Sequence, residues 1–174
     1  TMGWTKHVED EKQLAGMPES ALAAAKAAAE SKELDGYLLT LDIPSYLPVM
    51  TYCDNQELRK ELYEAYVTRA SDRGPKAGEW DNSEIINEQL KLRYEIARML
   101  GFNTFSEKSL ATKMAENPSQ VLGFLNDLAN KAKPQGEREV EELRQFAKSE
   151  FGVEELNLWD IAYYSEKQKQ HLFQ

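Results

Sequence analysis

The sequence predicts a mainly α protein, a multi-helical domain with one small antiparallel β-hairpin. Apolar residues recur at helical spacing in several stretches that begin with a proline or a capping residue. Two short stretches, Trp4–Val8 and Tyr37–Ile43, have the alternation or the composition typical of strands. We expect the hairpin and a connecting helix in residues 1–43 and a helical part in residues 44–174, with no linker between two domains.

The first part of the chain is expected to place a helix between the two strands. Trp4–Val8 is predicted to pair with Tyr37–Ile43, and Pro44 should end the second strand. Between them, Pro18 opens an alanine-rich helix that should end near Lys32. Its apolar stripe is thin, so we expect this helix at the surface.

Two helices of the second part begin with capping-box spacing, in which a glutamate follows a polar residue three positions later. Asp54 should start a helix that reaches about Ser71, and Asp81 should start a stronger helix that ends at Gly101. The residues that follow at helical intervals are Leu58, Leu62, Ala65, Tyr66 and Arg69 on the first helix, and Ile85, Gln89, Leu92, Ile96 and Leu100 on the second.

Prolines and glycines mark the remaining elements. Pro118 and Pro134 should each start a helix, the second ending at Gly152, and a last helix should follow Leu158. Residues 71–82 carry two glycines and a proline and are predicted to form the one long loop of the chain. Loops of this length are often functional.

Composition excludes several classes of function. The net charge of −9 opposes the phosphate neutralisation on which nucleic-acid binding depends. No apolar run approaches the roughly 20 residues that cross a bilayer, so we expect a soluble protein without a membrane partner. One cysteine, Cys53, cannot form an internal disulfide, which favours a cytoplasmic location.

Neither histidine has the neighbours of a metal ligand. His7 and His171 are the only histidines, and neither lies in an H-E-x-x-H pattern. His7 and Glu9 would share one side of a strand, but no third ligand accompanies them. A solvated His7 is therefore favoured over a metal ligand.

The other reactive groups also favour structural interpretations. Cys53 follows an apolar run and is expected to pack in the core rather than act as a nucleophile. The stretch 74–78 resembles a phosphate loop in its glycines, but Glu79 stands where a lysine would grip phosphate. Carboxylates concentrate at residues 8–11 and 137–143, where solvated faces are favoured over acid and base pairs.

Aromatic residues near the end of the chain leave two alternatives open. Trp159, Tyr163 and Tyr164 could form a platform for a ligand, yet the spacing of four between Trp159 and Tyr163 is more typical of a buried helical stripe. From the residues alone, no catalytic, cofactor-binding or metal-binding residue is assigned to this chain.

The ends of the sequence suggest an interior segment. Residues 156–174 still follow an aromatic helical pattern when the sequence stops, and Met2 is not followed by a secretory signal. We therefore expect this chain to be one fragment, residues 1–174, of a longer polypeptide.

A resemblance to a known family extends this interpretation. From Met2 to Phe173 the chain resembles the thimet oligopeptidase family of zinc metallopeptidases, in the stretches LAGMPESALAAAK, IPSYLPVMTYCDNQ, NSEIINEQLKLRYEIARMLGF, SLATKMAENPSQVLGFLNDL, KPQGEREVEELRQFAK and WDIAYYSEKQKQ. The resemblance implies a parent enzyme that is cytoplasmic and hydrolyses short peptides internally. It also implies Zn²⁺ bound by an H-E-x-x-H helix and a downstream glutamate, C-terminal to the W-D-x-x-Y-Y stretch.

These zinc ligands are absent from the sequence, so no site residue can be carried over and the fragment is expected to be inactive and to bind no Zn²⁺ itself. We expect it to contact the remaining domains of the same polypeptide as a scaffold and as part of the wall of the substrate channel. In this hypothesis the helices between Asp54 and Ala147 form the wall. The alternative is an autonomous helical module that binds a protein partner and has no enzymatic role.

Overall fold

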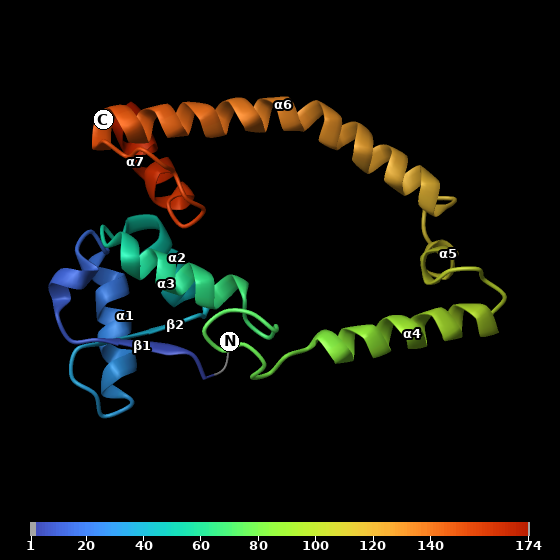
Figure 1. Ribbon diagram of the computed structural model, residues 1–174, viewed down its shortest axis with the longest axis horizontal. Coiled ribbons are helices and arrows are strands. Elements are labelled where there is room, and N and C mark those ends of the chain that lie inside the picture. Colours follow the sequence, from blue (N-terminus) through green and yellow to red (C-terminus); the bar gives the residue numbers. More distant parts are fainter. Residues whose placement is uncertain (1–2, 174) are drawn as a thin grey trace. The chain divides into compact units, whose positions relative to one another are not determined.

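A computed structural model describes residues 3–173 (Figure 1). The elements are β1 Thr5–Val8, a 3-10 helix η1 Glu11–Leu14, α1 Glu19–Glu30, β2 Tyr37–Thr40, α2 Ile43–Tyr52, α3 Gln56–Val67, α4 Ser83–Met99, α5 Phe105–Leu110, α6 Pro118–Phe151 and α7 Ile161–Phe173. The mainly α prediction is confirmed. Within the described residues, no helix is both long and apolar enough to cross a membrane. The chain forms two compact units, one of residues 1–81 with 142–174 and one of residues 82–141.

The predicted strand pairing is confirmed. β1 and β2 pair antiparallel, with Thr5 opposite Thr40 and Val8 opposite Tyr37. The second strand is shorter than predicted, because it ends at Thr40 and Ile43 already belongs to α2. Pro44 therefore starts a helix, a position that tolerates its missing amide proton, rather than only ending a strand.

The alanine-rich helix α1 connects the two strands, as predicted, and packs against β2 (Figure 1). It buries Ala25 and Ala29, and most of its other residues are exposed or half-buried, which agrees with a surface helix. The main core of the first unit lies between α1, the strands, α2 and α3. Its buried residues are Val8, Leu14, Met17, Ala25, Leu39, Tyr46, Val49, Met50, Cys53, Leu58 and Leu62.

The two predicted capping residues are each displaced by one position. Asn55 caps α3, because its side chain accepts a hydrogen bond from the amide of Leu58 at 3.2 Å. Asn82 is the residue before α4 and makes no side-chain cap. The helix predicted from Asp54 also ends earlier than Ser71, at Val67.

The prediction that Pro134 starts a separate helix is wrong. A single helix, α6, runs from Pro118 to Phe151 with Pro134 inside it. Around the proline, side chains pair at the spacing of one helical turn, including Lys131 with Asp127 at 2.7 Å and Lys133 with Glu137 at 3.8 Å. Such pairs favour a continuous helix despite the lost backbone bond.

The second unit, residues 82–141, contains α4, α5 and the first part of α6. α4 ends as predicted, since Gly101 follows it with a φ of +83°. Its apolar residues are poorly covered: Ile85 is 66% exposed, Leu92 47% and Ile96 46%. Only Ala97 of α4 is buried.

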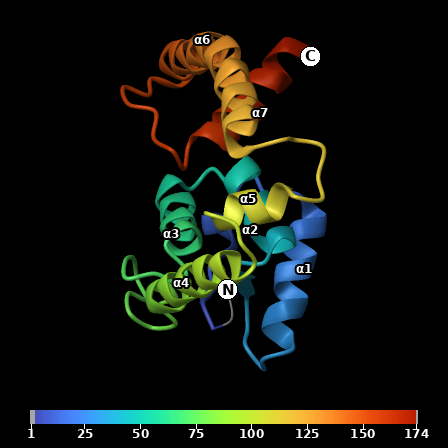
Figure 2. The ribbon, with the colours of Figure 1, turned by 90° about the vertical axis from the view of Figure 1, so that its right-hand side faces the viewer.

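The last helix packs on the end of α6 within the first unit (Figure 2). Leu143 and Ala147 of α6 and Tyr163 and Tyr164 of α7 form a second buried cluster. The preference for a buried aromatic stripe was right for the tyrosines. Trp159 lies before the start of α7 and packs half-buried against the main core, so it does not share a helix with Tyr163.

Candidate functional site

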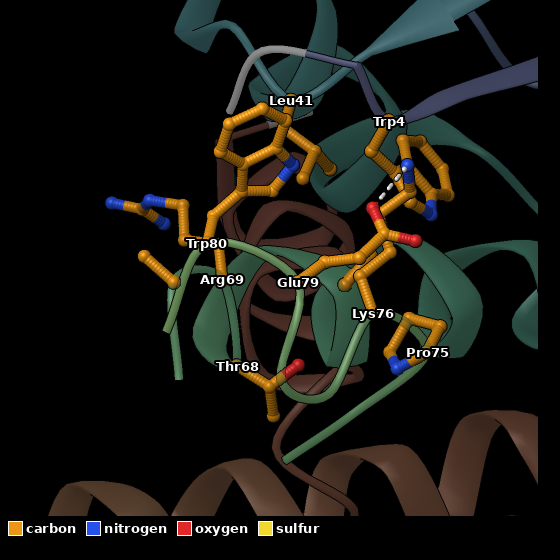
Figure 3. A pocket seen from close by; sticks show the side chains of 10 residues that line it. Trp4, Leu41, Thr68, Arg69, Pro75, Lys76, Glu79 and Trp80 are labelled. Carbon is orange, nitrogen blue, oxygen red and sulfur yellow. Dashed lines mark hydrogen bonds and ion pairs between the residues drawn. The ribbon is translucent and has the colours of Figure 1, made fainter. Parts of the chain in front are cut away.

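A pocket of about 260 Å³ lies in the first unit, beside the loop 71–82 (Figure 3). Four separate segments form it: the residue before β1, the residue after β2, the end of α3, and the loop itself. The lining residues are Trp4, Leu41, Ala65, Thr68, Arg69, Ala70, Pro75, Lys76, Glu79 and Trp80. The prediction of a long loop is confirmed, and this loop borders a cavity.

Several hydrogen bonds hold the loop against the end of α3. The hydroxyl of Ser71 donates to the carbonyl of Thr68 at 2.6 Å, and the amide of Gly78 donates to the carbonyl of Ser71 at 3.2 Å. Lys76 Nζ donates to the carbonyl of Gly3 at 3.1 Å, which ties the loop to the segment before β1. The loop therefore has a defined shape without a helix or strand of its own.

Two lining residues have an uncommon backbone conformation. Ala70 and Trp80 have φ angles of +56° and +61°, in the left-handed region that side chains other than glycine rarely adopt. Such residues often occur at ligand sites, where the surrounding structure maintains them. Trp80 is also 73% exposed, so its indole ring is available at the pocket.

The charged groups at the pocket are unequally paired. Lys76 Nζ lies 3.3 Å from a Glu79 carboxylate oxygen. Arg69 instead donates to the backbone carbonyl of Tyr66 at 2.5 Å, and its guanidinium lies 3.8 Å from the centre of the Tyr66 ring. Among the ion pairs of the described residues none includes Arg69, so the pocket edge keeps one positive charge.

Gly74 is expected to be essential to the shape of this loop. A Cβ atom at Gly74 would lie 1.8 Å from the hydroxyl oxygen of Thr68, at a φ of +82°. Gly74→Ala should therefore displace the loop and change the signals of Trp80 in a nitrogen–proton NMR spectrum. Gly78→Ala is the matched control, since Gly78 has a φ of +77° but open space around it. Equal spectral changes in both variants would contradict the contact with Thr68.

A buried ion pair connects α3 with the segment before α7. Arg59 Nη2 lies 2.7 Å from Asp160 Oδ1, and the two side chains are 1% and 0% exposed. Arg59 also donates to the carbonyls of Cys53 at 2.7 Å and Trp159 at 3.3 Å, while Gln56 donates to Asp160 at 3.0 Å. A buried ion pair is stable only when hydrogen bonds also occupy its remaining donors and acceptors, as they do here. The sequence analysis missed this pair, because its members are 101 residues apart.

Asp54, predicted as a helix cap, has another role. Its carboxylate accepts a hydrogen bond from the Tyr163 hydroxyl at 2.7 Å and lies 3.6 Å from Lys167 Nζ. Burial, together with the hydrogen bond to Asp54, raises the pKa of Tyr163 well above its usual value. The bond thus holds α7 against the start of α3 and keeps the phenol protonated.

Cys53 packs in the core, as predicted. Its side chain is fully buried, and Sγ donates to the carbonyl of Gln13 at 3.4 Å. Burial raises the pKa of the Cys53 thiol, which disfavours the reactive thiolate. A nucleophilic role therefore finds no support.

Comparison with known proteins identifies the family. The sequence pattern of Peptidase family M3 matches residues 49–174. The chain belongs to this family. It is 73% identical over 173 residues to oligopeptidase A of Escherichia coli, and 65% identical over 173 residues to oligopeptidase A of Haemophilus influenzae. Each alignment covers 99% of this chain and 25% of the relative.

More distant relatives carry similar names. A protein of Arabidopsis thaliana named "Probable cytosolic oligopeptidase A" is 39% identical over 176 residues, which cover 96% of this chain and 24% of the relative. The chain thus spans about a quarter of the length of the curated relatives it matches. The family resemblance seen in the sequence is confirmed.

The side chains described here do not fit the zinc that the M3 resemblance implies. His7 Nε2 is bonded to the backbone carbonyl of Asp35 at 2.5 Å, and the His171 ring lies 5.6 Å from the ring of Phe146. Within residues 3–173, no group of three His, Cys, Asp or Glu side chains could hold a metal ion. A catalytic zinc needs three protein ligands. The described residues therefore do not provide the ligand set of a catalytic zinc.

Proposed function

We propose that this chain is a supporting segment of a longer, zinc-dependent endopeptidase that hydrolyses short peptides in the cytoplasm. The observation that carries the proposal is the 73% identity over 173 residues to oligopeptidase A of Escherichia coli. In this proposal the zinc ligands lie in other parts of the longer polypeptide. The residues of this chain contribute rigid structure rather than catalytic groups.

The uncovered apolar surface of α4 supports contacts with the remaining domains of the same polypeptide. In addition to Ile85, Leu92 and Ile96, a second side of the helix exposes apolar residues: Ile86 is 53% exposed, Leu90 57% and Tyr94 55%. A helix that is apolar on more than one side is typical of the interior of a large protein. We infer that other domains cover α4 in the longer protein.

The wall of the substrate channel is the specific role that we propose for the helices from α3 to α6. An enzyme limited to short peptides needs a narrow, walled channel that excludes folded proteins. The outer edge of β1 could pair with an extended peptide, because β1 has only β2 as a neighbour in the described sheet. The loop 71–82 would border the channel.

Hydrogen exchange can test whether α4 is covered. The amide protons of α4 should exchange rapidly in the 174-residue chain and much more slowly in the longer protein. The amide protons of α1, which packs on the sheet within the first unit, are the internal control. Equally fast exchange of α4 in both proteins would contradict the scaffold role.

Peptidase assays test whether the catalytic groups lie outside this chain. The 174-residue chain should cleave no peptide, whereas the longer protein should cleave short peptides in a way that a zinc chelator abolishes. Chelator-sensitive cleavage by the purified 174-residue chain would overturn the proposal.

Shortening the loop 71–82 in the longer protein should change the range of peptide lengths that are cleaved, and an unchanged range would exclude this loop from the wall.

The exposed apolar surface also favours a second candidate, an autonomous helical module that binds another protein. The two proposals differ in the reading frame that follows Gln174. An H-E-x-x-H pattern downstream in the same polypeptide supports the peptidase, and a stop codon there supports the module.

A further inference from the structure

The pocket beside the loop 71–82 has the size of one large side chain. Its volume of about 260 Å³ lies below the range of about 300–1,000 Å³ that is usual for small-molecule sites. Trp4 and Trp80 line it together with Leu41, Ala65 and Pro75 (Figure 3). An apolar or aromatic side chain would find a matching environment there.

One cation at the pocket edge is free to bind an anion. Arg69 lines the pocket, is exposed, and has the Tyr66 carbonyl and the Tyr66 ring as its partners. The second cation, Lys76, already lies beside Glu79. A guanidinium binds a carboxylate through charge-assisted hydrogen bonds, and its several N–H groups leave donors for one here.

We propose that this pocket binds the carboxyl-terminal residue of a peptide when that residue is apolar or aromatic. Its side chain would enter between Trp4 and Trp80, and its terminal carboxylate would lie on Arg69. A carboxyl-terminal residue carries its side chain and the terminal carboxylate on the same Cα atom, which matches an apolar cavity with one unpaired cation at its edge. The proposal rests on the proposed function in that peptides are the ligands.

Other occupants match these features less well. A glutamate or aspartate side chain would supply the anion but would leave the apolar cavity unfilled. A cationic side chain would meet the unpaired charge of Arg69, and the carboxylate of Glu79 already has Lys76 as its partner. A second copy of this chain is an alternative outcome of the test.

The test is a titration of the 174-residue chain with the tripeptide Ala-Ala-Phe and with the same tripeptide as a carboxyl-terminal amide. The readout is the indole signals in a nitrogen–proton NMR spectrum, because Trp4 and Trp80 line the pocket whereas the third tryptophan, Trp159, packs against the core. We expect the free acid to shift the signals of Trp4 and Trp80. The amide should bind with an affinity at least about tenfold lower.

Variants assign the effect to Arg69. Arg69→Gln should weaken binding of the free acid to the level of the amide, and Arg69→Lys should restore part of the difference. Arg73→Gln is the matched control, because Arg73 is an exposed arginine four residues away in the loop 71–82 and does not line the pocket. If Arg69→Gln fails to fold, the comparison of acid and amide binding to the unchanged chain still shows whether the pocket recognises the terminal carboxylate.

Several results would overturn the proposal. These are an absence of binding at millimolar concentrations, equal binding of acid and amide, or shifts confined to Trp159. A dimer in sedimentation experiments that Trp80→Ala dissociates would assign the pocket to a second copy instead. The proposed function is tested separately, since peptide cleavage is measured on the longer protein and can persist when this pocket binds nothing.

Discussion

Asp160→Ala is expected to lower the free energy of unfolding by about 3–5 kcal/mol, because removal of one partner leaves the other charge buried and uncompensated. Asp160 is fully buried and is the one carboxylate in ion-pair contact with Arg59 in the described structure. The remaining hydrogen-bond partners of Arg59 are backbone carbonyls, and its guanidinium lies 4.1 Å from the centre of the Tyr163 ring, so none of its other partners carries a full charge. Urea denaturation of the chain, followed by circular dichroism, measures the change.

The control for Asp160→Ala is an exposed ion pair of similar length. Glu154 lies 2.9 Å from Lys148 Nζ, and the two side chains are 80% and 61% exposed. Glu154→Ala should change the free energy of unfolding by no more than about 1 kcal/mol, because water screens such pairs. A similarly small effect of Asp160→Ala would show that the buried ion pair contributes little to stability.

Leu62→Ala is expected to cost about 2–5 kcal/mol of unfolding free energy. Leu62 lies on α3, is fully buried, and belongs to the main core of the first unit. Its truncation would leave a cavity in this core that the neighbouring elements cannot fill without moving. Chemical denaturation again provides the measurement.

The same substitution at an exposed leucine separates burial from helix propensity. Leu47 lies on α2 and is 50% exposed, so Leu47→Ala should change the unfolding free energy much less than Leu62→Ala. Equal effects at the two positions would contradict the location of the core.

Local signals in the sequence predicted much of the fold. Helices begin or end at Pro18, Pro118, Gly101 and Gly152. Each of these residues acts through its own backbone, so its effect can be predicted from a single sequence. The short α5 was not predicted, because six residues are too few for a helical period. Pro134 was misleading, because a proline inside a helix and a proline at the start of one look alike in a single sequence, and the helix continues through this position.

The candidate site could not be predicted in the same way. The loop 71–82 was recognised from its glycines and proline, but its partners Trp4 and Leu41 come from positions far away in the sequence. The Arg59–Asp160 pair depends in the same way on tertiary packing. Periodicity located an apolar face on α4, but it cannot tell what covers that face.

The separation between Arg59 and Asp160 also has a consequence for synthesis on the ribosome. The carboxylate is added 101 residues after the arginine, which corresponds to about 5–20 s at usual rates of elongation. During that time the nascent chain has α3 but no counterion for its guanidinium. The first unit can therefore reach its final packing only after Asp160 has emerged, so we expect this unit to complete its folding well after α3 has been synthesised.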